Sequence, residues 1–215
     1  MTGSRGMFIS FEGNEGCGKS TQIALLTERL RAAGRNVIAL REPGGTGLGE
    51  ALRDILKTPT EGVEIDPVSE LLLMNASRAQ LVRQIIEPHL AQGAIVLVDR
   101  FFDSTVVYQG YGRGLDLDLV RKTIEVAVGK TIPDLTLLLK VPLQVSESRR
   151  ASRAQSSGPE RDRFEESERA FFERVEQGYD AIAKESSGRV RVIDATCDID
   201  TVQQAIWAEV SGSLQ

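Results

Sequence analysis

The sequence predicts an α/β fold with one mostly parallel sheet and helices on both of its faces. Short apolar runs alternate with amphipathic helical stretches along all 215 residues, which is the pattern of a parallel sheet with crossover helices. No low-complexity linker or internal repeat divides the chain, so we expect one domain over residues 1–215. The predicted strands are Met7–Glu12, Val37–Leu40, Ala94–Asp99, Leu135–Lys140 and Val190–Asp194.

The segments between these strands carry the spacing of amphipathic helices. One stretch differs: Ala154–Asp162 mixes small, polar, proline and glycine residues with arginines on both sides, which predicts a mobile loop. The predicted helices are Ser20–Ala33, Gly47–Leu56, Pro67–Gln92, Asp103–Tyr111, Leu117–Val128, Pro142–Ala154, Glu165–Glu185 and Ile199–Gly212.

Composition excludes several kinds of function. The net charge of -5, from 26 Lys and Arg against 31 Asp and Glu, provides no overall basic field for a nucleic-acid polymer. The single histidine, His89, rules out multi-histidine metal sites and leaves catalysis to lysine, arginine, carboxylates and a metal ion. Two cysteines cannot form a disulfide framework and no apolar run is long enough to span a membrane, so we expect a cytoplasmic protein.

The first predicted strand leads into FEGNEGCGKST, which predicts a phosphate-binding loop. Gly13, Gly18, Lys19 and Ser20 fit the spacing G-x4-G-K-[ST], between a strand and a helix as the motif requires. The glycines let backbone N–H groups turn toward a phosphate chain, Lys19 neutralises it and Ser20 offers a hydroxyl to Mg²⁺. A chance glycine-rich turn is the alternative. We expect a nucleoside triphosphate to contact Gly13, Asn14, Glu15, Gly16, Cys17, Gly18, Lys19, Ser20 and Thr21.

The third predicted strand ends in a charged pair, Asp99 and Arg100. The run AIVLV before it is apolar, and ligands of α/β sheets bind at the carboxyl ends of the strands. Asp99 is therefore the expected partner of Mg²⁺ beside Ser20, directly or through a water. Arg100 carries a planar set of N–H donors suited to a phosphate. A structural salt bridge at the strand end is the other interpretation.

Two further segments predict contacts to a sugar and a base. The run DSTVVYQG places Thr105, Tyr108 and Gln109 about one turn apart, although an ordinary helix cap would look similar. Arg78 lies on the apolar stripe of the long helix PVSELLLMNASRAQ. Because a buried guanidinium is costly unless it is paired or reaches a polar cavity, we favour a ligand-facing role over snorkelling. Met74 forms either an apolar floor under a base or part of the core.

The segment REPGGTGLGEALRD follows the second predicted strand. It begins with Arg41 and Glu42, continues through a Pro-Gly-Gly turn, and carries Arg53 on the helix after it. Arginine near the ligand-binding edge of the sheet suggests contacts to an anionic ligand. A surface salt bridge is an equal alternative for this arginine.

These motifs together resemble the bacterial thymidylate kinase family. EGNEGCGKST, REPGGT, SRAQL, DRFFDSTVVYQGYGRGL, PDLTLLL and DRFEE occur in the family's order and approximate spacing over nearly the whole chain. The resemblance implies a P-loop kinase fold, with a five-stranded parallel sheet flanked by helices on both faces and a mobile lid. It also implies transfer of the γ-phosphoryl group of ATP to dTMP, giving dTDP and ADP for dTTP biosynthesis, with Mg²⁺ and a homodimer.

The resemblance further implies roles for matched positions. Arg78 would hydrogen-bond the thymine, and Arg53 and Arg100 would hold the acceptor phosphate. Met74 departs from the pattern, because the family usually has a stacking phenylalanine there; we expect weaker discrimination between bases. The implied substrate-binding residues are Glu42, Pro43, Arg53, Met74, Arg78, Arg100, Thr105, Tyr108 and Gln109.

The lid is expected at about residues 149–165. One branch of the family has an arginine in the phosphate loop and another has arginines in the lid. This chain resembles the second, with Arg149, Arg153, Arg161 and Arg163, although neighbouring carboxylates also allow a solvated charged face. The expected catalytic residues are Lys19, Asp99, Arg100, Arg149, Arg153 and Arg163.

Other functions stay open on the residues alone. Another nucleoside-monophosphate kinase, acting on dUMP, UMP, CMP or a purine nucleotide, would share the loop and the lid, although REPGG and the YQG block disfavour it. A nucleotide-controlled P-loop switch would require an Asn-Lys-x-Asp segment that reads guanine, which the sequence lacks. A non-catalytic nucleotide-binding module is disfavoured because the loop lysine, the strand aspartate and the lid arginines are all present.

Overall fold

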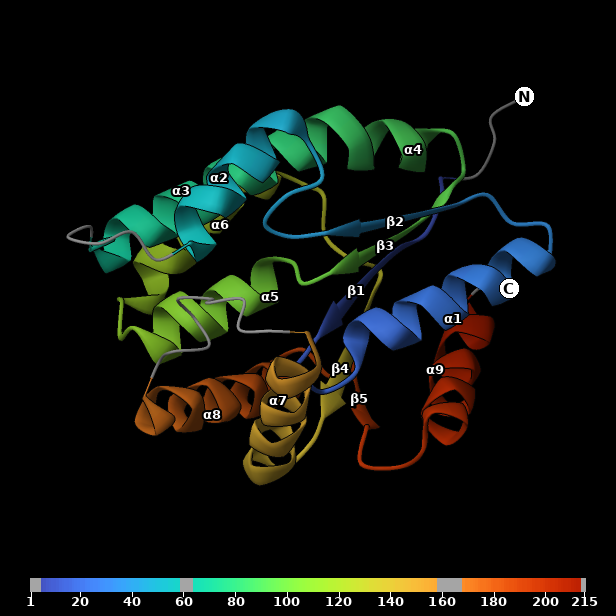
Figure 1. The fold of residues 1–215 in the computed structure, drawn as a ribbon. Helices are drawn as coiled ribbons and strands as arrows, with labels where there is room; N and C mark the ends of the chain where they lie inside the picture. The colour runs from blue at the N-terminus through green and yellow to red at the C-terminus, as the bar shows by residue number, and fades with distance from the viewer. Residues whose placement is uncertain (1–4, 59–63, 158–167, 214–215) are drawn as a thin grey trace.

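The computed structural model describes residues 5–58, 64–157 and 168–213, and its centre is a five-stranded parallel sheet in the order β2-β3-β1-β4-β5. Figure 1 shows the sheet between two layers of helices. The predicted α/β fold with a five-stranded parallel sheet is confirmed. The strands are β1 (Phe8–Glu12), β2 (Val37–Arg41), β3 (Ile95–Asp99), β4 (Leu135–Lys140) and β5 (Val190–Asp194).

Strand β1 lies in the middle of the sheet and is buried on both faces. All of FISFE is buried, and β1 pairs with β3 on one side and with β4 on the other. Because successive side chains point to opposite faces, Phe8 packs into one hydrophobic core while Ile9 and Phe11 pack into the other. Such two-sided burial explains why the strand is an uninterrupted apolar run rather than an alternating one.

Helices cover the two faces unequally. Helices α1 (Lys19–Ala32) and α9 (Ile199–Ser213) pack on one face, where Leu26 and Val202 belong to the same hydrophobic core as Ile9 and Leu97. The opposite face carries the larger core, and α2 (Gly47–Lys57) packs against α3. The helices on that face are α3 (Pro67–Leu81), α4 (Glu87–Ala91), α5 (Phe102–Thr105), α6 (Leu117–Val128) and α8 (Arg169–Glu185).

Two π-helical segments interrupt the predicted α-helices. The helix predicted over Pro67–Gln92 runs as α3, η1 (Val82–Ile86) and α4, and the widened η1 turn ends two residues before Pro88, which has no N–H to donate. The helix predicted over Asp103–Tyr111 runs as α5 and η2 (Val106–Gly112). Single π-turns within helices occur often at functional sites.

The loop predicted over Ala154–Asp162 is partly wrong. Helix α7 runs from Leu143 to Ser157, so the first residues of that stretch are helical. Residues 154–157 contain no glycine or proline, and the alanine and glutamine among them are good helix formers, which explains the extension. The rest of the stretch, and residues 158–165 of the expected lid, lie outside the described residues.

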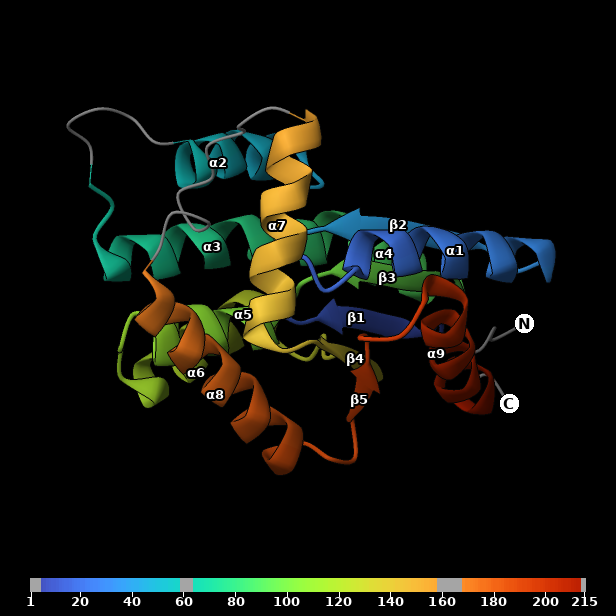
Figure 2. The same ribbon diagram turned by 60° about the horizontal axis from the view of Figure 1, so that its bottom comes forward.

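Helix α7 follows β4 and stands across the carboxyl ends of the strands (Figure 2). The carboxyl edge of a parallel sheet is where α/β proteins bind their ligands. The chain segments that leave β1, β2, β3 and β4 meet at this edge, and α7 borders it. None of the helices in the described ranges has the length and apolar content that crossing a bilayer would require.

Candidate active site

The phosphate loop connects β1 to α1 at the carboxyl edge of the sheet. Gly13 has a φ of 133°, and a Cβ there would lie 2.3 Å from the carbonyl oxygen of Leu139, so both the backbone shape and the space require glycine. Gly18 ends the loop with a φ of 100°. No side chain caps α1 and its first turn has no acidic residue, which leaves this helix end electrostatically suited to a phosphate.

Lys19 is buried inside this loop, with 6% of its surface exposed. Its Nζ donates to the carbonyl oxygen of Gly13 at 3.3 Å and lies 3.9 Å from the carboxylate of Asp99. Burial and the charge of Arg100 act to lower the pKa of Lys19, but Cys17, Asp99 and Glu15 outweigh them, so its pKa lies above the usual value. The site therefore keeps this ammonium charged.

Ser20 and Asp99 meet where Mg²⁺ was expected. The hydroxyl of Ser20 donates to Oδ2 of Asp99 at 3.0 Å, and Ser20 is exposed at the mouth of the loop. Hydroxyl and carboxylate oxygens are the donors that Mg²⁺ prefers. Within the described ranges, no group of three or more His, Cys, Asp or Glu side chains could hold a metal by itself. The pair thus fits a Mg²⁺ site that the phosphates of a nucleotide would complete.

Arg100 joins the phosphate loop to the segment after β3. Its NH2 nitrogen donates to Glu15 at 2.7 Å and to the hydroxyl of Tyr108 at 3.1 Å. Burial works to raise the pKa of Glu15, but the charges of Arg100 and Lys19 hold it well below its usual range. The loop carboxylate is thus ionised and fixes the arginine beside the phosphate loop.

Arg78 and Glu42 form a buried ion pair between α3 and the end of β2. Arg78 donates from Nε to Oε2 of Glu42 at 2.8 Å, and also to Asn75 and to the carbonyl oxygen of Phe101. Oε1 of Glu42 is buried without a hydrogen-bond partner in the described part of the chain. Burial raises the pKa of Glu42 although Arg78 opposes it. Arg78 is therefore paired, as a buried guanidinium requires.

The other predicted substrate residues are held by hydrogen bonds or by burial. Arg53 donates to the carbonyl oxygen of Pro43 at 2.8 Å. The buried amide of Gln109 donates to Glu70 at 2.7 Å, so it is held by α3. Met74 is half-buried against the larger core. Thr105 is buried at the end of α5.

One predicted lid arginine lies against the phosphate loop. Arg149, on α7, donates to the carbonyl oxygens of Gly16 at 3.5 Å and Ala195 at 3.2 Å. One turn earlier, the Ser146 hydroxyl donates to the carbonyl oxygen of Glu15 at 2.6 Å, which holds α7 against the loop. The side chain of Arg153 and all of Arg161 and Arg163 lie outside the described residues.

Known proteins resemble the chain over almost its whole length. The sequence profile of the thymidylate kinase family matches residues 11–206. The chain belongs to the thymidylate kinase family. A thymidylate kinase from Syntrophotalea carbinolica is 47% identical over 208 residues, covering 96% of each chain, and one from Deinococcus radiodurans is 46% identical, covering 97% of this chain and 98% of its own. The crystal structure of thymidylate kinase from Ehrlichia chaffeensis superposes with a TM-score of 0.77 at 35% identity, covering 96% and 99%.

Membership of the thymidylate kinase family confirms the predicted family and the predicted kinase class. It does not favour the nucleotide-controlled switch or the non-catalytic module. The phosphate loop and the REPGG and YQG segments, which pointed to this family, meet at one edge of the sheet.

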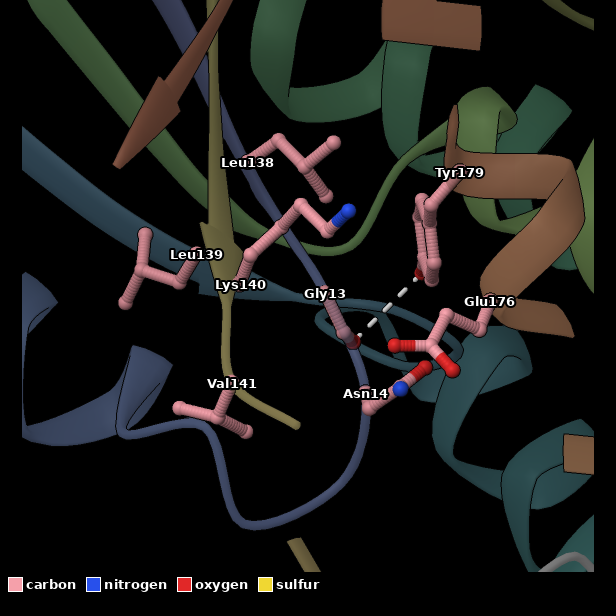
Figure 3. Close-up of a pocket in the computed structure, with 8 residues that line it drawn as sticks. All are labelled: Gly13, Asn14, Leu138, Leu139, Lys140, Val141, Glu176 and Tyr179. Atoms are coloured by element: carbon pink, nitrogen blue, oxygen red, sulfur yellow. Dashed lines mark hydrogen bonds between the residues drawn. The ribbon is translucent and has the colours of Figure 1, made fainter. Parts of the chain in front are cut away.

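Sequence reasoning assigned no role to Glu12 and Tyr179. Glu12 is the last residue of β1, and its only local signal is a carboxylate at the end of an otherwise apolar strand. Tyr179, on α8, donates toward the carbonyl oxygen of Gly13 at 3.4 Å (Figure 3). Figure 3 also shows Asn14 and Glu176 pointing toward one another across a water-sized pocket, which is too small for a nucleotide.

Proposed function

We propose that the chain transfers the γ-phosphoryl group of ATP to dTMP, forming dTDP and ADP at the carboxyl edge of the sheet. One observation carries the proposal beyond the family match. Arg100 contacts Glu15 of the phosphate loop at 2.7 Å and Tyr108 of η2 at 3.1 Å, so a fixed positive charge lies between a donor loop and a polar acceptor segment. A phosphoryl transfer needs a cation in that position.

On the donor side, Lys19 and the loop amides bind the phosphates of ATP. The ammonium of Lys19 is buried and its pKa is raised, so it neutralises charge on the terminal phosphates without a change of protonation. Ser20 and Asp99 would hold Mg²⁺, directly or through a water. When bound, Mg²⁺ neutralises negative charge on the phosphates.

On the acceptor side, the phosphate of dTMP arrives ionised. Its second pKa is near ~6, so the attacking oxygen needs no general base. Arg100 and Arg53 orient this phosphate, and Arg78 reads the thymine edge. NH1 of Arg78 donates to Asn75 at 3.1 Å and carries a second N–H for the base. Glu42, Pro43, Met74, Thr105, Tyr108 and Gln109 complete the acceptor pocket.

We propose Arg149 as the lid arginine because its side chain contacts the phosphate loop. It lies at the outer edge of the phosphate loop, 3.5 Å from the carbonyl oxygen of Gly16. Beside the phosphate loop, its guanidinium would stabilise charge on the transferred phosphoryl group in the transition state. Arg153 and Arg163 stay candidates for the same task.

We also propose that the chain forms the predicted homodimer and that residues 1–215 form the predicted single domain. Helix α3 packs against both α2 and α6, which lie near it in Figure 1, and all three helices expose apolar side chains. Val126 on α6 is 78% exposed, Leu72 on α3 is 56% exposed and Ile55 on α2 is 54% exposed. An exposed apolar face fits a second copy of the chain. A single species of monomer mass in sedimentation would refute this assembly. A cytoplasmic location also stays a prediction, supported by the cysteine content.

The acceptor identity is tested by measuring ADP release with dTMP, dUMP, UMP, CMP, GMP and AMP. We expect the highest kcat/KM with dTMP, and a smaller margin over dUMP than a stacking aromatic ring would provide, because of Met74. Preference for any other acceptor would overturn the assignment.

A further inference from the structure

We propose that Glu12 is a positioning residue for Arg100, because its carboxylate holds both the backbone and the guanidinium of that arginine. Glu12 is 1% exposed at the end of β1, directly before the phosphate loop. It has no place in the mechanism above. This inference rests on the proposed role of Arg100 at the acceptor phosphate.

The first contact holds the backbone. Arg100 has a φ of 68° and is the one non-glycine residue in the described ranges with a positive φ. Residues with a Cβ rarely adopt this conformation unless their surroundings impose it. Here the N–H of Arg100 donates to the carbonyl oxygen of Phe11 at 2.9 Å, and the next N–H, that of Phe101, donates to Oε1 of Glu12 at 2.8 Å. The strand end thus fixes the amide on each side of the strained residue.

The second contact holds the guanidinium through hydroxyl groups. Ser104 donates to Oε2 of Glu12 at 2.5 Å and accepts from NH1 of Arg100 at 3.0 Å. Tyr179 repeats this arrangement: its hydroxyl lies 3.3 Å from Oε2 of Glu12 and accepts from the same NH1 at 3.1 Å. Each hydroxyl has one proton. When that proton is donated to Glu12, the hydroxyl oxygens of Ser104 and Tyr179 are free to accept the N–H groups of Arg100.

The two contacts act on different atoms of one residue. NH1 is held from the Glu12 side, while NH2 is held by Glu15 and Tyr108. The guanidinium plane is therefore set on both edges before any substrate binds, which is the preorganisation that electrostatic catalysis requires. Without Glu12, Ser104 would lose the acceptor that orients its proton, and the proton of Tyr179 would be left with the carbonyl oxygen of Gly13, 3.4 Å away.

Glu12→Gln tests the proposal with little change in size. The glutamine oxygen can still accept from Phe101, but its NH2 group places donors where Ser104 and Tyr179 need an acceptor. We expect kcat/KM for dTMP to fall by about 10²-fold, since misplacement by about 1 Å costs that much, while the KM for ATP stays within ~3-fold. In an Arg100→Lys background, Glu12→Gln should cause no further loss, because the residue through which Glu12 acts is already gone.

Ile206→Ala serves as the stability control. Ile206 is fully buried on α9, on the other face of the sheet, so its truncation lowers the melting temperature and should leave the KM for dTMP unchanged. If Glu12→Gln reduces activity equally in both Arg100 backgrounds, its role is structural and the proposal fails. If Arg100→Lys is impaired while Glu12→Gln matches the wild type, the inference fails but the proposed function stands.

Two further outcomes concern Arg100 itself and a Glu12→Gln variant that does not fold. If Arg100→Lys itself matches the wild type with dTMP, the assignment of Arg100 fails and Glu12 loses its proposed task. If Glu12→Gln does not fold, Ser104→Ala and Tyr179→Phe each remove one link to NH1 of Arg100. Both should raise the KM for dTMP, and unchanged kinetics in both variants would overturn the proposal.

Discussion

Glu42 and Arg78 are 36 residues apart in the chain, yet NH2 of Arg78 lies 2.7 Å from Oε2 of Glu42 and each side chain is only 3% exposed. The pair joins the turn after β2 to the long helix α3. Burying two charges is offset only when both remain paired, so each residue depends on the other. One ion pair thus ties together the two segments that are proposed to bind the acceptor.

Replacing one partner of this pair should destabilise the protein more than replacing both partners. Arg78→Met leaves the carboxylate of Glu42 buried and unpaired, with an expected loss of ~3–5 kcal/mol in the free energy of unfolding. The double variant Glu42→Gln, Arg78→Met should be more stable than Arg78→Met alone. Urea unfolding at neutral pH measures both, and a double variant less stable than the single one would contradict the expectation.

Removal of the Lys19 charge should abolish most activity without unfolding the chain. Lys19→Met keeps the length of the side chain but loses the ammonium that contacts the carbonyl oxygen of Gly13. We expect kcat to fall by about 10²–10³-fold, as for other preorganised charge stabilisers. Lys184→Met, at an exposed position near the end of α8, is the matched control. Rates of Lys19→Met within ~3-fold of the wild type would refute its role.

Two neighbouring arginines on α7 should behave differently. Arg149 contacts Gly16 of the phosphate loop, whereas Arg150 lies 4.4 Å from the ring centroid of Phe172. Arg149→Ala should lower kcat by about 10³-fold if it acts on the transferred phosphoryl group. Arg150→Ala should cost ~1 kcal/mol in stability through the lost cation–π contact, with a small change in kcat. Steady-state kinetics and thermal unfolding of both variants test this expectation. A larger loss of kcat in Arg150→Ala than in Arg149→Ala would contradict it.

The pH dependence of stability should contain a contribution from Glu12. Burial and the nearby charge of Asp103 raise the pKa of Glu12 from 4.5 to about 7, against the effect of Ser104 and Arg100. The folded state therefore binds more protons than the unfolded state between these pH values. The contribution to the unfolding free energy should fall as pH rises from 4.5 to 7 and then level off.

Glu12→Gln should flatten this slope, because glutamine does not titrate. Urea unfolding of the wild type and of Glu12→Gln at a series of pH values from 4.5 to 8 compares the two slopes. Identical slopes would show that the pKa of Glu12 is not raised.

Much of the fold was predictable because its signals are local. The apolar runs predicted each strand to within one residue at either end. Strands β1, β3 and β4 are buried along almost their whole length, so they need no alternation of apolar and polar residues. The π-segments η1 and η2 were not predictable, because one extra residue per turn hardly changes the helical spacing of apolar residues. The extension of α7 to Ser157 was missed because the polar stretch was interpreted as a loop.

The parts of the site that belong to a sequence motif could be predicted. Contacts between residues far apart in the sequence could not. The phosphate loop and the Ser20–Asp99 pair follow from a motif and from the end of an apolar strand. The contacts of Glu12 with Ser104 and Tyr179 span 92 and 167 residues. No local pattern marks such partners, so only the folded chain shows them.

The strand order β2-β3-β1-β4-β5 divides the work of the site between the two sides of its central strand. The segments after β2 and β3 carry Glu42 and Arg100, while β4 leads into α7 and Arg149. Glu42 and Arg100, which are proposed to bind the acceptor, and Arg149, which is proposed to act on the transferred phosphoryl group, therefore follow strands on opposite sides of β1. If these proposed roles hold, substitutions after β2 and β3 should change the choice of acceptor nucleotide and leave α7 as it is.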